Sequence, residues 1–175
     1  MLKEDVFIVG AARTAVGSFL GMYSSSPATE LGRTAIQAAV ERAGLEPKDI
    51  QEVFMGCVLT GAQGQAPARQ ASLKAGIPES TPCTTVGKVC GSGAQSIILG
   101  ARTLALGEND IVVAGGMENM TMAPYAMPKG RTGFRMGPGQ VVDEMVHDGL
   151  WDPYGNQHMG MFAEKCADKY GFTRE

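Results

Sequence analysis

Short apolar runs alternate with longer helical segments as far as residue 114, and this alternation restricts the fold more than any other feature of the sequence. Four runs are apolar or β-branched and of strand length: residues 6–9, 53–55, 84–89 and 111–114. Between them lie three segments with a helical pattern, each followed by glycine: residues 29–43, 68–75 and 94–106. Strands that alternate with helices favour an α/β fold in which helices cover both faces of a sheet.

The character of the sequence changes after residue 116. Residues 117–161 contain eight of the eleven methionines, four of the nine prolines and no convincing strand. Between residues 119 and 142 the charged side chains are Lys129, Arg131 and Arg135, with no acid. We therefore expect residues 1–118 to form an α/β domain and residues 119–175 to contain an inserted loop region and no further part of the sheet. The basic stretch is either a solvated surface loop or an edge that faces a phosphate or a partner subunit.

The charge of the chain is close to neutral. Its 175 residues include 15 Lys and Arg against 18 Asp and Glu, a formal net charge of −3. This balance argues against a nucleic-acid surface or a polybasic membrane face. The sequence has no leader-like start and no apolar run approaching about 18 residues, so neither secretion nor membrane spanning is indicated. A cytoplasmic location is the expectation that follows.

The positions of cysteine and histidine give little support to metal or disulfide chemistry. The four cysteines form no C-x-x-C pair, and the two histidines lie at no metal-ligand spacing. We therefore predict neither a metal site nor a disulfide framework. The ordinary role of a cysteine in such a chain is that of a small buried hydrophobe.

Cys90 has a sequence context that suggests a different role. It directly follows a predicted strand and lies where a long helix begins, in the segment Gly87-Lys-Val-Cys90-Gly-Ser-Gly93. Free backbone N–H groups and the helix dipole at such a point favour an anion, which increases the thiolate fraction. Gly91 and Gly93 keep the turn narrow, so that an oxyanion can reach the N–H of Cys90 or of a neighbour. Cys90 is thus a candidate nucleophile, with the buried hydrophobe as the alternative.

The segment around Cys90 resembles the active-site cysteine segment of the thiolases, the acetyl-CoA acetyltransferase family. Four further stretches are similar to that family in order and spacing: Gly10-Ala-Ala-Arg-Thr14, Gly64-Gln-Ala-Pro-Ala-Arg-Gln70 with Ala75-Gly-Ile-Pro78, Gly115-Gly-Met-Glu-Asn-Met120, and His158-Met-Gly160. The similarity extends over essentially the whole chain. One departure is Gly87, where the family usually has an asparagine that supports the loop.

The resemblance implies a two-step Claisen exchange with Cys90 as the catalytic nucleophile. The thiolate takes an acyl group from acyl-CoA or 3-ketoacyl-CoA, and the acyl-enzyme exchanges with CoA or the enolate of acetyl-CoA. Coenzyme A and acyl-CoA are then substrates, and no tightly bound cofactor is expected. Leu150, His158 and Met159 correspond to the part of the family's loop domain that covers the pantetheine arm. The residues alone equally allow Met159 to be a core methionine and His158 an ordinary residue at a helix start.

The resemblance also implies that part of the catalytic machinery is absent from these residues. The family has its catalytic histidine, a second cysteine and an asparagine-held water in its C-terminal half, and no segment here matches them. The implied fold is an α/β fold with a mixed sheet flanked by helices, the N-terminal half of an αβαβα core, plus part of an inserted loop domain. Because residues 173–175 resemble the first turn of another helix, we expect an N-terminal piece of a longer enzyme, inactive by itself.

The family resemblance carries expectations about partners as well. A homodimer or homotetramer is implied, with the strand at residues 84–89 at the dimer interface and residues 129–135 in the position of a tetramerisation loop. Neither nucleic acid nor membrane is an expected partner. Two alternatives stay open: an acyl-CoA-binding or assembly subunit completed by a separate C-terminal chain, and a ketoacyl synthase, which shares the fold.

Overall fold

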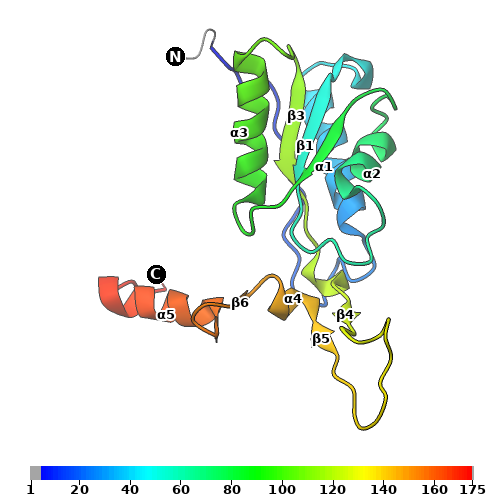
Figure 1. The fold of residues 1–175 in the computed structure, drawn as a ribbon. Helices are drawn as coiled ribbons and strands as arrows, with labels where there is room; N and C mark the ends of the chain where they lie inside the picture. The colour runs from blue at the N-terminus through cyan, green and yellow to red at the C-terminus, as the bar shows by residue number, and fades with distance from the viewer. Residues whose placement is uncertain (1–4, 175) are drawn as a thin grey trace. The chain divides into compact units, whose positions relative to one another are not determined.

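The computed structural model describes residues 5–174 (Figure 1), and the chain divides into two compact units. The first unit ends at Met122, and the second begins at Ala123. The first contains a sheet with its covering helices, and the second consists of short strands and helices. No helix within residues 5–174 combines the length and the apolar character that crossing a membrane requires.

The first unit is built on a parallel three-stranded sheet in the order β2-β1-β3. The strands are β1 (Glu52–Gly56), β2 (Cys83–Val86) and β3 (Val112–Gly116). In the centre, Val53 pairs with Cys83 on one side and with Val113 on the other. Parallel neighbours need a crossover, and a helix supplies each one. These crossover helices are α2 (Pro67–Lys74), between β1 and β2, and α3 (Ser92–Ala105), between β2 and β3.

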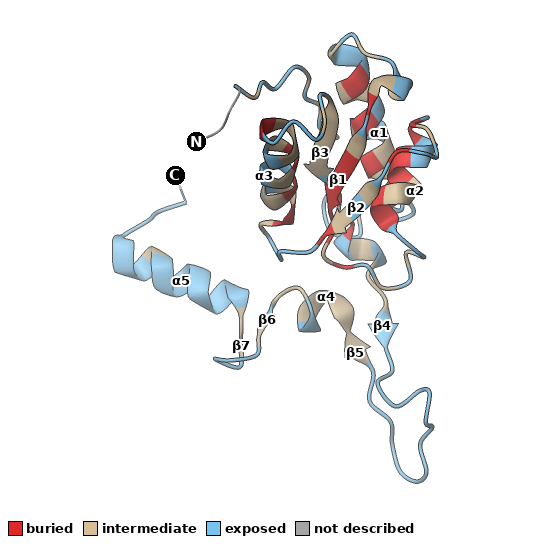
Figure 2. Cartoon of the chain, turned by 45° about the horizontal axis from the view of Figure 1, so that its top comes forward, coloured by how far each residue is buried: buried red, intermediate tan, exposed pale blue. Residues whose placement is uncertain are grey.

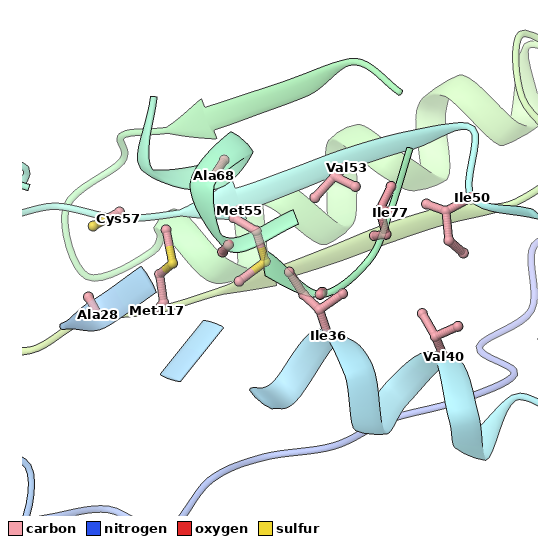
Figure 3. Close-up of a cluster of buried hydrophobic side chains, with 12 residues drawn as sticks. Ala28, Ile36, Val40, Ile50, Val53, Met55, Cys57, Ala68, Ile77 and Met117 are labelled. Carbon is pink, nitrogen blue, oxygen red and sulfur yellow. The ribbon is translucent and has the colours of Figure 1, made fainter. Parts of the chain in front are cut away.

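Helices cover both faces of the sheet, as the alternating sequence pattern predicted. α1 (Ala28–Arg42) packs with α2 on one face, and α3 lies on the other (Figures 1 and 2). Ile36 and Val40 of α1 join Val53 and Met55 of β1 in a buried hydrophobic cluster (Figure 3). Burying an aliphatic side chain of this kind contributes about 1.5–3 kcal/mol. The α/β fold is confirmed, and the three predicted helices begin and end within two residues of the observed ones.

α3 approaches the sheet through small residues. Ser96 and Gly100 are buried on its inner face, and a Cβ added at Gly100 would lie 3.1 Å from Cγ2 of Val112. Its outer face carries Ile97 and Ile98, which are 49% and 45% exposed. The small inner residues therefore bring the helix axis close to β3, while apolar side chains of the outer face stay accessible.

The prediction of a buried strand at residues 6–9 is wrong. Within the described residues this run pairs with no strand, and Phe7 and Ile8 are 75% and 80% exposed. An apolar run forms a strand only where a neighbouring strand offers backbone hydrogen bonds, and composition carries no information about that neighbour. The segment that follows contacts α1 instead, where Nη1 of Arg42 donates to the carbonyl of Ala11 at 2.8 Å.

Within residues 123–174, the second unit contains two short antiparallel strand pairs and two helices. Its elements are β4 (Tyr125–Ala126), β5 (Val142–Asp143), α4 (Glu144–His147), β6 (Trp151–Asp152), β7 (Gln157–His158) and α5 (Met159–Tyr170). β4 pairs with β5, and β6 pairs with β7. The helix that ends at Gly171 was predicted, and this glycine has a φ of +66°. The strand pairs were not, because two residues are too few for a periodic pattern.

Candidate active site

Cys90 lies in the turn that joins β2 to α3. Figure 2 labels these two elements. It is exposed, which excludes the alternative role of a small buried hydrophobe. β2 ends at Val86, so the predicted continuation of this strand to residue 89 is wrong. Its pairing with β1 stops there, because Val86 lies opposite Gly56, the last residue of β1; further on, Val89 has a φ of +45°, in the left-handed region that strands do not contain. Cys90 is thus presented at the junction of strand and helix.

Two backbone N–H groups next to Cys90 donate hydrogen bonds to carbonyl groups of the same turn. The N–H of Gly91 donates to the carbonyl of Lys88, and the N–H of Ser92 donates to the carbonyl of Val89, both at 3.0 Å. The expectation that neighbouring N–H groups are available to an oxyanion is therefore wrong for these two. The N–H of Cys90 itself remains the candidate donor.

The ends of β1 and β3 form the surface on which the start of α3 rests. A Cβ added at Gly56 would lie 2.5 Å from the carbonyl carbon of Ser92 and 2.6 Å from the nitrogen of Gly93. A Cβ added at Gly116 would lie 3.2 Å from Cα of Gly93. Backbone can approach backbone this closely only where no side chain intervenes. The sequence signal for both positions was a glycine at the end of a predicted strand.

Glu118 joins the segment after β3 to the segment after β1. Its carboxylate accepts hydrogen bonds from the backbone N–H groups of Val58 at 2.8 Å and of Leu59 at 3.2 Å. Sγ of Cys57 lies 3.7 Å from the same carboxylate. Hydrogen bonds to a carboxylate are stronger than those to a neutral acceptor, so the two segments are held firmly together. Sequence reasoning included Glu118 in a motif but did not single it out as a functional residue.

The three residues expected to bind coenzyme A lie together in the second unit. The N–H of Met159 donates to the carbonyl of Leu150 at 2.8 Å, and Nδ1 of His158 accepts from the N–H of Gly160 at 2.9 Å. The second bond caps α5, which agrees with His158 as an ordinary residue at a helix start. Met159 is 38% exposed, so it is not a core methionine. Cys90 belongs to the first unit.

Other polar groups of the second unit lie at its surface. Lys129, Arg131 and Arg135 are exposed in the loop that joins β4 to β5. Nδ1 of His147 lies 2.6 Å from the carboxylate of its neighbour Asp148, and both side chains are exposed. Across residues 5–174, no three His, Cys, Asp or Glu side chains are grouped so as to hold a metal ion.

The amino-acid sequence is similar to a known protein family and to proteins of known function. Residues 6–175 match the model of the family described as "Thiolase, N-terminal domain". The chain is 54% identical over 171 residues to an acetyl-CoA acetyltransferase from Cupriavidus necator and 52% identical over 172 residues to one from Pseudomonas aeruginosa. Each alignment covers 98% of this chain and 44% of the relative, so the chain spans less than half of the length of these relatives.

Structural comparison gives the same result. The solved structure of the Acat5 thiolase from Ascaris suum, in complex with coenzyme A, is similar with a TM-score of 0.91 at 40% sequence identity. The match covers 98% of this chain and 44% of that chain. Because the N-terminal domain model extends over nearly every residue and the fold agrees throughout, the chain belongs to the thiolase family.

Proposed function

We propose that this chain is the N-terminal part of an acetyl-CoA C-acetyltransferase that carries the acyl group as a thioester on Cys90. The observation that carries the proposal is the exposed cysteine at the junction of β2 and α3. The relatives named acetyl-CoA acetyltransferase support acetyl-CoA as a substrate. The thiolase solved with coenzyme A supports binding of that group. A role in fatty acid metabolism follows from the same reaction, because thiolysis shortens a 3-ketoacyl chain.

The first half-reaction moves an acyl group from coenzyme A to the protein. The Cys90 thiolate attacks the carbonyl carbon of acyl-CoA and forms a new S–C bond. The bond from that carbon to the sulfur of coenzyme A then breaks, and the departing thiolate takes up the proton that Cys90 lost. The N–H of Cys90 and the positive end of the α3 dipole stabilise the charge that develops on the carbonyl oxygen.

The second half-reaction needs a base. For condensation, the base removes a proton from the methyl group of acetyl-CoA, and the resulting enolate attacks the thioester and releases Cys90 as a thiolate. Both histidines of this chain lie in the second unit, where His147 pairs with Asp148 and His158 caps α5. We assign the base and the second cysteine to the part of the relatives that this chain does not match. The chain alone is then inactive in the full cycle.

Leu150, His158 and Met159 cover the pantetheine arm in this proposal. The backbone bond from Met159 to Leu150 fixes the start of α5, and the exposed Met159 side chain offers apolar surface to the arm. Trp151, the one tryptophan of the chain, pairs with His158 in the β6–β7 ladder and serves as a fluorescent reporter.

Titration with coenzyme A tests the role of Met159. We expect Met159→Ala to weaken the fluorescence response several-fold, whereas Met161→Ala, a substitution on the same helix at a 51% exposed residue, leaves it unchanged. Equal affinity of the two variants would contradict a role of Met159 in binding.

Assembly and location are further parts of the proposal. A homodimer or homotetramer is supported by the edge position of β2 in the sheet and by the exposed basic loop of residues 127–141. The exposed outer face of α3 equally favours the alternative of a binding or assembly subunit completed by a separate chain. Light scattering of the purified chain distinguishes monomer, dimer and tetramer.

We propose a cytoplasmic location, as in the relative from Gibberella zeae named cytosolic; the rat relative is named mitochondrial.

The central test joins this chain to the C-terminal half of the Cupriavidus necator relative. We expect the chimera to exchange acetyl groups between acetyl-CoA and CoA, while the isolated chain shows little exchange. Cys90→Ser abolishes the exchange with folding retained, and Cys166→Ser, at an exposed cysteine of α5, does not. Mass spectrometry is expected to find the acetyl adduct on Cys90. Exchange by the Cys90→Ser chimera, or an adduct on Cys57 or Cys83 instead, would contradict the assignment.

A further inference from the structure

The hydroxyl of Ser92 joins two backbone groups that precede Cys90. It accepts a hydrogen bond from the N–H of Lys88 and donates one to the carbonyl of Val89, each at 2.7 Å. Ser92 is 4% exposed, so both bonds form away from competing water. The hydroxyl bonds backward to the turn and not to an N–H group of α3, so it is not an ordinary helix cap.

Val89 is the residue that this hydroxyl constrains. Its φ of +45° is unfavourable for a β-branched side chain. The side chain is 55% exposed, so its own packing does little to offset the strain. The carbonyl of Val89 instead accepts two hydrogen bonds from Ser92, one from Oγ at 2.7 Å and one from the backbone N–H at 3.0 Å.

We propose that Ser92 is a positioning residue for Cys90. Its hydroxyl holds Val89 in the left-handed conformation and thereby fixes the thiol of Cys90 at the start of α3. The inference rests on the proposed role of Cys90 as the nucleophile, and it assigns Ser92 no contact with the substrate.

The surroundings of Ser92 allow the hydroxyl to be removed alone. A Cβ added at Gly56 would lie 2.8 Å from Cβ of Ser92, so this position accepts only a small side chain. Alanine fits the same space and lacks the donor and acceptor. Ser96 provides a matched control, because it is fully buried one turn further along α3 and, within residues 5–174, its hydroxyl bonds only to the carbonyl of Ser92, at 3.0 Å.

Alkylation of the 175-residue chain with iodoacetamide measures the position of Cys90. Mass spectrometry gives the rate at Cys90 relative to that at Cys166, an exposed thiol of the second unit that serves as an internal reference. We expect Ser92→Ala to lower this ratio at least about fivefold near neutral pH, because it removes both hydrogen bonds of the hydroxyl and the net loss of even one implies that factor. Ser96→Ala changes the ratio by less than about twofold, because its hydroxyl does not touch the turn. An unchanged or increased ratio in Ser92→Ala would overturn the proposal.

A second variant tests the route through Val89. Glycine carries no penalty at positive φ, so Val89→Gly removes the strain that Ser92 is proposed to offset. We expect Ser92→Ala to change the labelling ratio less than about twofold in a Val89→Gly background. A fivefold effect of Ser92→Ala in that background would show that Ser92 does not act on Cys90 through Val89. If Ser92→Ala alone does not fold, the proposal requires the chain with both Ser92→Ala and Val89→Gly to fold. A double variant that is also unfolded contradicts the proposal.

The labelling experiment is independent of acyl transfer. Acetyl exchange by the Cys90→Ser chimera would refute the proposed function and would leave the labelling ratios as measured. A normal acetyl adduct on Cys90 combined with an unaffected ratio in Ser92→Ala would instead refute only the role of Ser92.

Discussion

Replacing Gly56 with alanine places a methyl group against the backbone at the start of α3. The added Cβ would lie 2.5 Å from the carbonyl carbon of Ser92 and 2.6 Å from the nitrogen of Gly93, about 0.9 Å short of an ordinary contact at 3.4 Å. These are backbone atoms, so no rotamer change can relieve the overlap, and the helix start has to move. Overpacking of this kind costs about 1–3 kcal/mol, and each kcal/mol lowers the Tm of a chain of this size by about 3 °C.

Gly87→Ala is the matched control for this substitution. Gly87 lies in the turn that carries Cys90, and an added Cβ there meets no described atom within 4 Å. We expect urea unfolding to show a loss of stability for Gly56→Ala and almost none for Gly87→Ala. Because the displaced helix start carries Cys90, alkylation of this thiol relative to Cys166 also changes in Gly56→Ala alone. A Gly56→Ala chain as stable as the control, with unchanged labelling, would refute the argument that β1 supports the start of α3.

Substitutions at two further residues test hydrogen bonds of the first unit. Glu118→Ala leaves two backbone N–H groups after β1 without their acceptor, so we expect a loss of about 2 kcal/mol in urea unfolding; Glu118→Gln, which keeps one acceptor oxygen, loses less. Hydrogen bonds from Lys74 first and then from Arg33 hold the pKa of Glu30 below its usual 4.5. The stability from this group is therefore present above pH 4.5 and is lost as the pH falls below it. Glu30→Gln is less stable than the parent chain near pH 7, and we expect this difference in stability to shrink as the pH falls below 4.5; a difference that stays constant with pH would contradict this account.

The sheet and its helices were predictable because each carries a complete local signal. α1 has a periodic apolar face, and two residues after its end the chain turns at Gly44, whose φ is +69°. β1 reads as a continuous apolar run because it is the central strand and four of its five residues are buried. Residues 6–9 carry the same apolar signal and form no strand, since a strand also needs a partner and the partner is not encoded locally.

Of the candidate site, the sequence predicts the position of Cys90 at a strand-to-helix junction but not the contacts around it. Cys90 lies between a β-branched run and a Gly-Ser-Gly segment, so strand, turn and helix start follow from neighbouring residues. Glu118 acts on Val58, 60 positions earlier in the chain, and no local pattern reports such a contact. The role of Ser92 depends on the unusual φ of Val89, which a valine gives no reason to expect.

The placement of Cys90 depends on contacts that restrain the backbone on either side of it. β1 and β3 run parallel, so their carboxyl ends meet at the same edge of the sheet, where Gly56 and Gly116 leave room for the start of α3. Glu118 holds the segments that leave these two strands, and Ser92 holds the turn that enters the helix. Each of these contacts restrains a different part of the backbone around one thiol. Substitutions at the buried contacts are therefore expected to alter Cys90 more than a substitution at the exposed Gly87, although Gly87 lies nearer to Cys90 in sequence than Gly56, Gly116 or Glu118.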